Sequence, residues 1–157
     1  MSIAPNKQSA NDALVSILRT ATVVQRHIAQ IVERSGITNQ QFNVLRILRG
    51  AGSAGLPTLA IRDRMIEESA GITRLLDKLE ASGFVARGRT TPDRRQVVCH
   101  ITPAGVRVLA ALDAPVQAAT ERAMSTLDDA EKQTLIALLG TVRSVFDDRR
   151  EERPGIE

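Results

Sequence analysis

The chain has 157 residues, 43% of them hydrophobic and 25% charged, which fits one domain or one subunit of a small dimer and excludes wholesale disorder. Aromatic residues make up only 2%, so an aliphatic core is expected, which favours helices packed on helices. One cysteine and two histidines exclude an internal disulfide and any multi-cysteine metal site, and the net charge of +3 is compatible with an anionic partner.

Targeting and catalytic signals are weak along the whole sequence. Residues 1–10 carry no apolar signal-peptide stretch, and no window approaches 18 uncharged apolar residues. We therefore expect a soluble, cytoplasmic protein without a membrane partner. No phosphate-binding loop, Ser/His/Asp order or paired-carboxylate cluster stands out, so we expect no enzymatic activity and no cofactor or metal.

The first two predicted elements are helices. Apolar residues recur at helical spacing over Ser9–Gly36, and Ser9 is expected to cap the free N–H groups of the first turn. The next helix begins at a capping box, Thr38-x-x-Gln41, and Gly50 is expected to end it.

A pair of helices joined by a short connector comes next. A short helix is predicted over Thr58–Met65, a connector over Ile66–Glu68 and a longer helix over Ser69–Ser82, with Gly83 as its C-terminal stop. This order of elements is typical of a helix-turn-helix.

A change of period marks a small β-ribbon after these helices. Over Gln96–Ile101 apolar and polar side chains alternate, so Cys99 is expected on one face with Val97 and Ile101. Residues Phe84–Arg89 are expected to pair with this strand. The connector between the strands is too long for a tight hairpin, which indicates a ribbon with an extended, charged tip.

Two further helices are predicted in the C-terminal third. One starts after Thr102, and Pro115 is expected either to kink it or to split it. The other starts at the capping pattern Asp128-x-x-Glu131, and residues 147–157 form a charged tail. These helices and the first one carry more apolar surface than a small domain covers, which predicts an obligate dimer.

The fold class expected is therefore mainly α with a small β-ribbon, a winged helix-turn-helix joined to a helical dimerisation region. This layout suits DNA, because a helix fits the major groove while a ribbon tip reaches the minor groove. The exposed side of the longer helix is expected to carry Thr73, Arg74, Asp77 and Lys78. The wing segment Arg87–Arg95 holds four arginines against one aspartate, a local charge of +3.

Three motifs resemble a known family. Residues Gly71–Val85 resemble the recognition helix and first wing strand of the MarR family of bacterial transcription regulators. Asp93–Arg95 is similar to the family's wing-tip signature of Asp, any residue, Arg, and Ile101–Gly105 is similar to its Leu-Thr-x-x-Gly element. The spacing between the three motifs also matches the family.

The resemblance implies a homodimer that binds double-stranded DNA at a pseudo-palindromic operator, usually as a repressor and often released by a small-molecule ligand. It implies a dimerisation helix over residues 1–36, a winged helix-turn-helix domain over 37–102, and dimerisation helices with a charged tail over 103–157. The DNA-binding residues it implies are Ser69, Thr73, Arg74, Lys78, Arg89, Asp93, Arg94 and Arg95.

Distinct roles are implied for these residues. Thr73 and Arg74 would face base edges or phosphates in the major groove, and Arg94 and Arg95 the minor groove. Asp93 would orient the wing arginine, because phosphate repels a carboxylate. The adjacent Glu67 and Glu68 depart from a favourable charge pattern, because they precede the recognition helix and oppose an incoming phosphate.

Two other functions stay open at this point. Glu67 and Glu68 suit a dimeric interaction module of the same fold with weak or lost DNA binding. Cys99 suits a redox-responsive regulator, although burial as a small hydrophobe is the default for its position. The segment Gly50–Gly55 spells G-x-G-x-x-G, but a predicted helix precedes it and Leu-Pro follows, so we interpret it as a connector.

Overall fold

The computed structural model describes residues 7–66, 71–89 and 97–151, and its two compact units are Met1–Ala119 and Thr120–Glu157. The elements follow in the order α1 (Lys7–Glu33), α2 (Asn39–Ala51), a 3-10 turn η1 (Gly52–Ala54), β1 (Leu56–Pro57), α3 (Thr58–Arg64), α4 (Ile72–Ala81), β2 (Val85–Arg89), β3 (Val97–Ile101), α5 (Pro103–Ala123) and α6 (Asp129–Glu151). The predicted class, mainly helical with a small β-ribbon, is confirmed.

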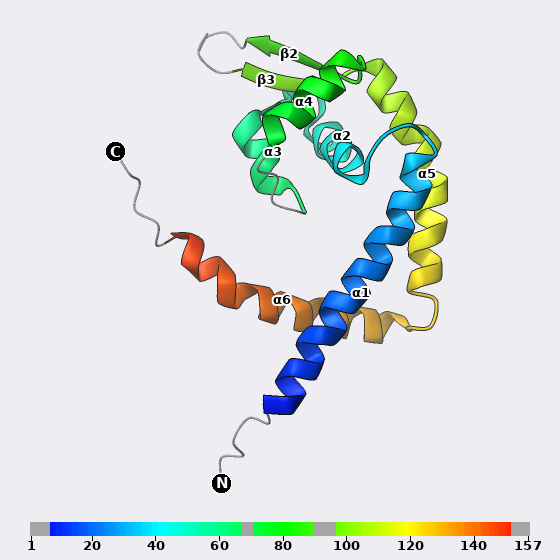
Figure 1. Ribbon diagram of the computed structural model, residues 1–157, viewed down its shortest axis with the longest axis vertical. Helices are drawn as coiled ribbons and strands as arrows, with labels where there is room; N and C mark the ends of the chain where they lie inside the picture. The colour runs from blue at the N-terminus through cyan, green and yellow to red at the C-terminus, as the bar shows by residue number, and fades with distance from the viewer. Residues whose placement is uncertain (1–6, 67–70, 90–96, 152–157) are drawn as a thin grey trace. The chain divides into compact units, whose positions relative to one another are not determined.

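The winged helix-turn-helix lies in the first unit. Helices α3 and α4 occupy the predicted places, and β2 and β3 form the antiparallel ribbon that follows them. Figure 1 shows this ribbon at one end of the unit, with α4 against it. The α4 helix begins at Ile72 with Gly71 in the cap position, later than the expected start at Ser69.

The sheet has a third strand that the sequence analysis missed. The strand order is β1-β3-β2, and Leu56 lies opposite Cys99 while Pro57 lies opposite Val98. The expected alternation along β3 is therefore only partly correct, because this strand is central in the sheet. Val98 and Cys99 are both buried, whereas Val97 is exposed.

An aliphatic core holds the first unit together. Its side chains come from α1, α2, β1, α3, α4, β2, β3 and α5, and all are nearly or fully shielded from solvent. The largest of those that are fully shielded are Val32, Val44, Leu45, Leu48, Ile61, Leu76, Leu79, Cys99 and Leu109. A core made almost wholly of Leu, Ile and Val agrees with the shortage of aromatic residues. Burial of this apolar surface is the main term that stabilises the unit.

Helix boundaries follow local capping chemistry with two corrections. The capping box at the start of α2 is confirmed, since the Gln41 N–H donates to the Thr38 hydroxyl over 3.2 Å and the Thr38 N–H to the Gln41 side chain over 2.8 Å. The expected cap at Ser9 is wrong, because α1 already begins at Lys7. The expected stop at Gly50 is also wrong: α2 continues to Ala51, and Gly52, at φ +61°, is the C-cap.

The junction between the sheet and α5 is closely packed. The Thr102 hydroxyl donates to the Gly83 carbonyl over 2.7 Å and accepts from the Gly105 N–H over 3.2 Å, which confirms Thr102 as the helix cap. A Cβ atom added to Gly105 would overlap the Phe84 carbonyl oxygen. Only glycine fits there without a shift of the backbone. Helix α5 then continues through Pro115 as one element, which excludes the split that the sequence left open.

The second unit consists mainly of α6. Its predicted capping box is confirmed, with the Glu131 N–H donating to Asp128 over 2.8 Å and the Asp128 N–H to Glu131 over 2.9 Å. The apolar residues beyond this box are mostly exposed. In the part of the chain that the structure describes, no helix is long and apolar enough to cross a membrane.

Candidate nucleic-acid interface

The outward side of α4 is the centre of the candidate site. Ile72, Leu75, Leu76 and Leu79 are buried at helical spacing. Thr73, Arg74 and Lys78 are exposed on the opposite side, as predicted. Because Arg74 and Lys78 are four residues apart, they lie one turn above each other on the same stripe. Both residues are exposed, and neither forms an ion pair with another described residue.

The other predicted contacts belong to the wing and the start of the recognition helix. Ser69, Asp93, Arg94 and Arg95 lie outside the described residues. Arg89 is the last residue of β2, which places its backbone at the far end of the described ribbon. The structure thus brings Thr73, Arg74 and Lys78 together, and the roles of all eight residues stay predictions.

Arg87 differs from the role that the wing charge implied. Its Nη2 atom lies 2.7 Å from the Asp77 carboxylate and donates to the Thr73 carbonyl oxygen over 3.3 Å, and its Nη1 lies 3.6 Å from Glu80. The cation that the sequence analysis counted toward the wing is therefore paired with the recognition helix. The sequence missed this role, because the contact depends on which face of β2 meets α4.

The environment of Arg87 preserves its charge. Burial opposes ionisation of the guanidinium, but the hydrogen bond to Asp77 and the charges of Asp77 and Glu80 outweigh it, so the pKa of Arg87 is raised. The side chain is 23% exposed. Its Nε is buried and has no hydrogen-bond partner among the described residues.

Cys99 is enclosed by the sheet and α3. It lies opposite Arg87 in the β2–β3 ladder and is fully buried, as the default interpretation predicted. Burial raises the pKa of the thiol, although the Arg87 charge and a hydrogen bond with Thr58 act in the opposite direction. A buried thiol with a raised pKa is a poor nucleophile, which weighs against the redox-responsive alternative.

The G-x-G-x-x-G segment serves packing. Gly52 and Gly55 both adopt positive φ, and a Cβ atom at Gly55 would lie 2.6 Å from the His100 ring and from the Cys99 carbonyl oxygen. The first two residues of the segment, Gly50 and Ala51, end α2, and Gly52–Gly55 connects this helix to β1. Within the described ranges, no three His, Cys, Asp or Glu side chains gather into a metal site.

Helix α3 adds cations that the sequence analysis did not single out. Arg62 and Arg64 are exposed in its last turn, and Arg62 lies 3.2 Å from its neighbour Asp63. The first helix of a helix-turn-helix crosses the DNA backbone. Both arginines lie just before the predicted helix-turn-helix connector, and that position is the sequence signal by which they could have been selected.

Comparison with known proteins places this site in a family. Residues 37–97 match the family description "MarR family". A protein of Thauera aromatica assigned to transcriptional regulation of the hcr operon is 31% identical over 109 residues, 69% of this chain and 64% of the relative, so the chain spans less than two thirds of that protein. The uncharacterised HTH-type transcriptional regulator YkoM of Bacillus subtilis is 32% identical over 117 residues, 74% of each chain.

Two further similarities cover most of the chain. The homoprotocatechuate degradative operon repressor of Escherichia coli is 24% identical over 141 residues, 90% of this chain and 94% of the repressor. The crystal structure of a mutant E. coli MarR complexed with operator DNA superposes with a TM-score of 0.74 at 25% identity, covering 90% of this chain and 99% of that one. The resemblance seen in the recognition helix and wing is thus confirmed: this chain belongs to the MarR family of transcriptional regulators.

Proposed function

We propose that the protein is a homodimeric, sequence-specific DNA-binding repressor that acts on a pseudo-palindromic operator. The observation that carries the proposal is the pair of cations, Arg74 and Lys78, on the solvent side of a recognition helix beside the wing. The relative from E. coli that is named an operon repressor supports the direction of regulation. A regulator bound at a promoter represses by occupying the DNA that polymerase needs.

The geometry of DNA supports this use of α4. A helix about 10–12 Å across enters the major groove, where an arginine can donate two hydrogen bonds to a guanine edge. The exposed Arg62 and Arg64 of α3 would neutralise flanking phosphates, as would the arginines predicted at the wing tip. Two copies related by a two-fold axis would read half-sites about 10 bp apart, one helical turn.

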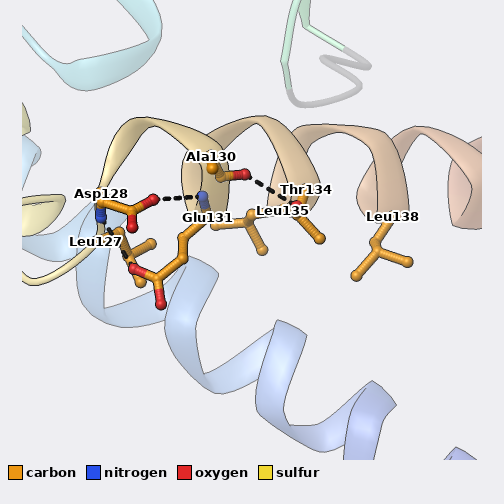
Figure 2. Close-up of a pocket in the computed structure, with 7 residues that line it drawn as sticks. All are labelled: Leu127, Asp128, Ala130, Glu131, Thr134, Leu135 and Leu138. Atoms are coloured by element: carbon orange, nitrogen blue, oxygen red, sulfur yellow. Dashed lines mark hydrogen bonds between the residues drawn. The ribbon is translucent and has the colours of Figure 1, made fainter.

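The second copy is proposed from α6. Apolar side chains project from this helix at a spacing of three and four residues and remain exposed; they are Leu135, Leu138, Val142 and Phe146. Leu127, Leu135 and Leu138 also line a shallow hollow of about 370 Å³ beside the capping box (Figure 2). An apolar stripe of this length on a helix is typical of a subunit contact.

To test DNA binding, a duplex is first selected from a random library with the wild-type protein. The affinity of Arg74→Ala for this duplex is then measured. Loss of a guanine contact should lower affinity for the selected duplex by about 1–3 kcal/mol and leave binding to a mixed-sequence duplex nearly unchanged. Arg107→Ala, which removes an exposed cation of α5, is the control. Equal losses on both duplexes would reassign Arg74 to the DNA backbone.

The wing is tested by replacing Arg94 and Arg95 with alanine. Each lost phosphate contact should flatten the slope of log K against log salt by about 0.9, while a purely minor-groove role would change sequence preference more than slope. Thermal melts of both proteins provide the folding control. Normal melting with unchanged affinity and salt slope would refute the wing assignment.

The dimer is tested by light scattering. A folded species near 17.0 kDa at micromolar concentration would contradict it. A dimer that selects no duplex would instead favour the interaction module with lost DNA binding. The family expectation of release by a small ligand completes the proposal; its test is a compound library screened for loss of binding to the selected duplex.

A further inference from the structure

The contacts of Arg87 divide the solvent side of α4 into two stripes. Thr73, Asp77 and Glu80 follow one another at intervals of four and three residues, so they lie on one side of the helix, and Arg87 contacts all three from β2. Arg74 and Lys78 lie on the adjoining stripe. The recognition helix therefore has an acidic side against the wing strand and a basic side facing solvent.

The acidic side is a problem for a helix that approaches phosphate. Asp77 follows Arg74 by three residues and precedes Lys78 directly, so an unpaired carboxylate there would offset much of their attraction for DNA. Arg87 places a cation 2.7 Å from that carboxylate and within 3.6 Å of Glu80. The charge of Arg87 is therefore compensated by carboxylates of the protein itself.

We propose that Arg87 is a positioning residue for DNA binding, and that it holds α4 against β2 and compensates the charge of Asp77, and part of that of Glu80, without itself contacting DNA. This inference rests on the proposed function and assigns a role to a residue outside the predicted contact set. It also couples the wing to the recognition helix, because the same side chain belongs to the wing strand and binds three residues of α4.

The shape of the side chain explains why the position requires arginine. Three acceptors on α4, two carboxylates and one carbonyl, meet two guanidinium nitrogens that diverge in a fixed plane. A lysine ammonium has a single nitrogen and cannot reproduce the two diverging nitrogens that meet these acceptors. The guanidinium is also largely buried, which keeps it away from a phosphate approaching the exposed side.

The first test measures, without DNA, how firmly the Arg87 contacts tie α4 to β2. Hydrogen exchange of the free protein should show α4 amides in Arg87→Gln exchanging roughly tenfold faster, because a partly buried, charge-assisted contact is lost, while α5 amides stay unchanged. Arg87→Lys should fall between this variant and the wild type. Arg62→Gln is the matched control, since its carboxylate partner Asp63 lies on the same helix and joins no two elements. Unchanged α4 exchange in Arg87→Gln would overturn the tie.

The second test is a double-mutant cycle on the duplex selected by the wild-type protein. Arg87→Gln should weaken binding roughly tenfold, Asp77→Asn should stay within about twofold of the wild type, and the double variant should regain roughly threefold over Arg87→Gln. Recovery occurs because removal of the carboxylate charge replaces its neutralisation. No recovery in the double variant, or an equal gain when Asp77→Asn is made alone, would show that the two residues are not coupled in DNA binding and would overturn the proposal.

The two tests separate this inference from the proposed function. A wild-type protein that selects no duplex contradicts the proposed function, while the exchange measurement still decides whether Arg87 ties α4 to β2. Strong DNA binding by the wild type with no recovery in the double variant contradicts only the role of Arg87.

Discussion

Helices α4 and α6 are both amphipathic, but they cover their apolar sides differently. Leu76 and Leu79 of α4 are fully buried in the core of the first unit, whereas Leu138 and Phe146 of α6 are 62% and 64% exposed. Helix α4 therefore packs against elements of its own unit. Helix α6 retains an exposed apolar face, which is the basis for proposing that a second copy of the chain packs against it.

The difference shows that a helical hydrophobic pattern specifies a buried face without specifying what buries it. Within the first unit, strands and helices from α1 to α5 supply the cover. On α6 the leucines have the same spacing but stay exposed, so another surface is needed to bury them. The following predictions test this contrast.

The largest effect is expected from one substitution made in both helices. Leu76→Ala leaves a cavity in the core and should lower the free energy of unfolding by about 2–5 kcal/mol at every protein concentration. Leu138→Ala should cost much less in a dilute monomer, and its cost should grow as the concentration rises into the dimeric range. Urea titrations at several concentrations measure both; a Leu138→Ala cost independent of concentration would contradict the contrast.

A second comparison between the units uses the same substitution, glycine to alanine, at one position in each. Gly105→Ala should destabilise the protein by about 1–3 kcal/mol, because the added Cβ would overlap the Phe84 carbonyl oxygen and the Ile101 side chain. Gly140→Ala on α6 meets no atom within 4 Å and should stabilise the helix by up to about 1 kcal/mol. Thermal unfolding of the two variants should therefore shift in opposite directions. A stabilising Gly105→Ala would mean that the junction between β3 and α5 is looser than its contacts indicate.

The two capping boxes should be about equally important in the two units. Thr38→Ala and Asp128→Ala each remove an acceptor for a free helix N–H and should cost about 0.5–2 kcal/mol. Circular dichroism during urea unfolding measures both losses. A much larger loss at Thr38 would show that the surrounding core, and not the cap alone, depends on that turn.

The smallest effect is expected at a surface ion pair of the first unit. Arg49 donates two hydrogen bonds to Asp113, at 2.8 and 2.9 Å, which link α2 to α5. The hydrogen bond to Arg49 lowers the pKa of Asp113, so its stabilising contribution is present above the unfolded-state pKa and is lost as the pH falls through the lower folded-state pKa.

Because both side chains are partly exposed, Asp113→Asn should cost less than about 1 kcal/mol at neutral pH. The difference from the wild type should shrink as the pH falls through the lowered folded-state pKa of Asp113, and vanish once the aspartate is protonated in both states. Urea unfolding at neutral and acidic pH checks the prediction. A difference that persists in acid would point to packing as its cause.

Local patterns allowed most of the fold to be predicted from the sequence. The capping boxes at Thr38 and Asp128 depend on residues three positions apart, and the helix-turn-helix depends on apolar spacing within single helices. The change of period after the helix-turn-helix predicted the wing, and the family motifs added the roles expected of individual DNA-binding residues. The exposed positions of Thr73, Arg74 and Lys78 followed from the same spacing.

Features that depend on contacts between distant segments could not be predicted. Strand β1 has two residues, too few to show a period, and it is defined only by its pairing with β3. The role of Arg87 required the register of β2 and the side of α4 that meets it. The end of α2 was missed for a different reason, because Gly50 and Gly52 are equally suitable in sequence and only Gly52 adopts positive φ.

The short strand β1 also affects how the protein resists aggregation. It forms one edge of the sheet, has only two residues, and ends in Pro57, which has no N–H group to donate to another strand. Short edge strands and prolines discourage sheets of separate molecules from joining edge to edge. A protein proposed to assemble through its helices thereby keeps this edge of its sheet from competing as a route to aggregation.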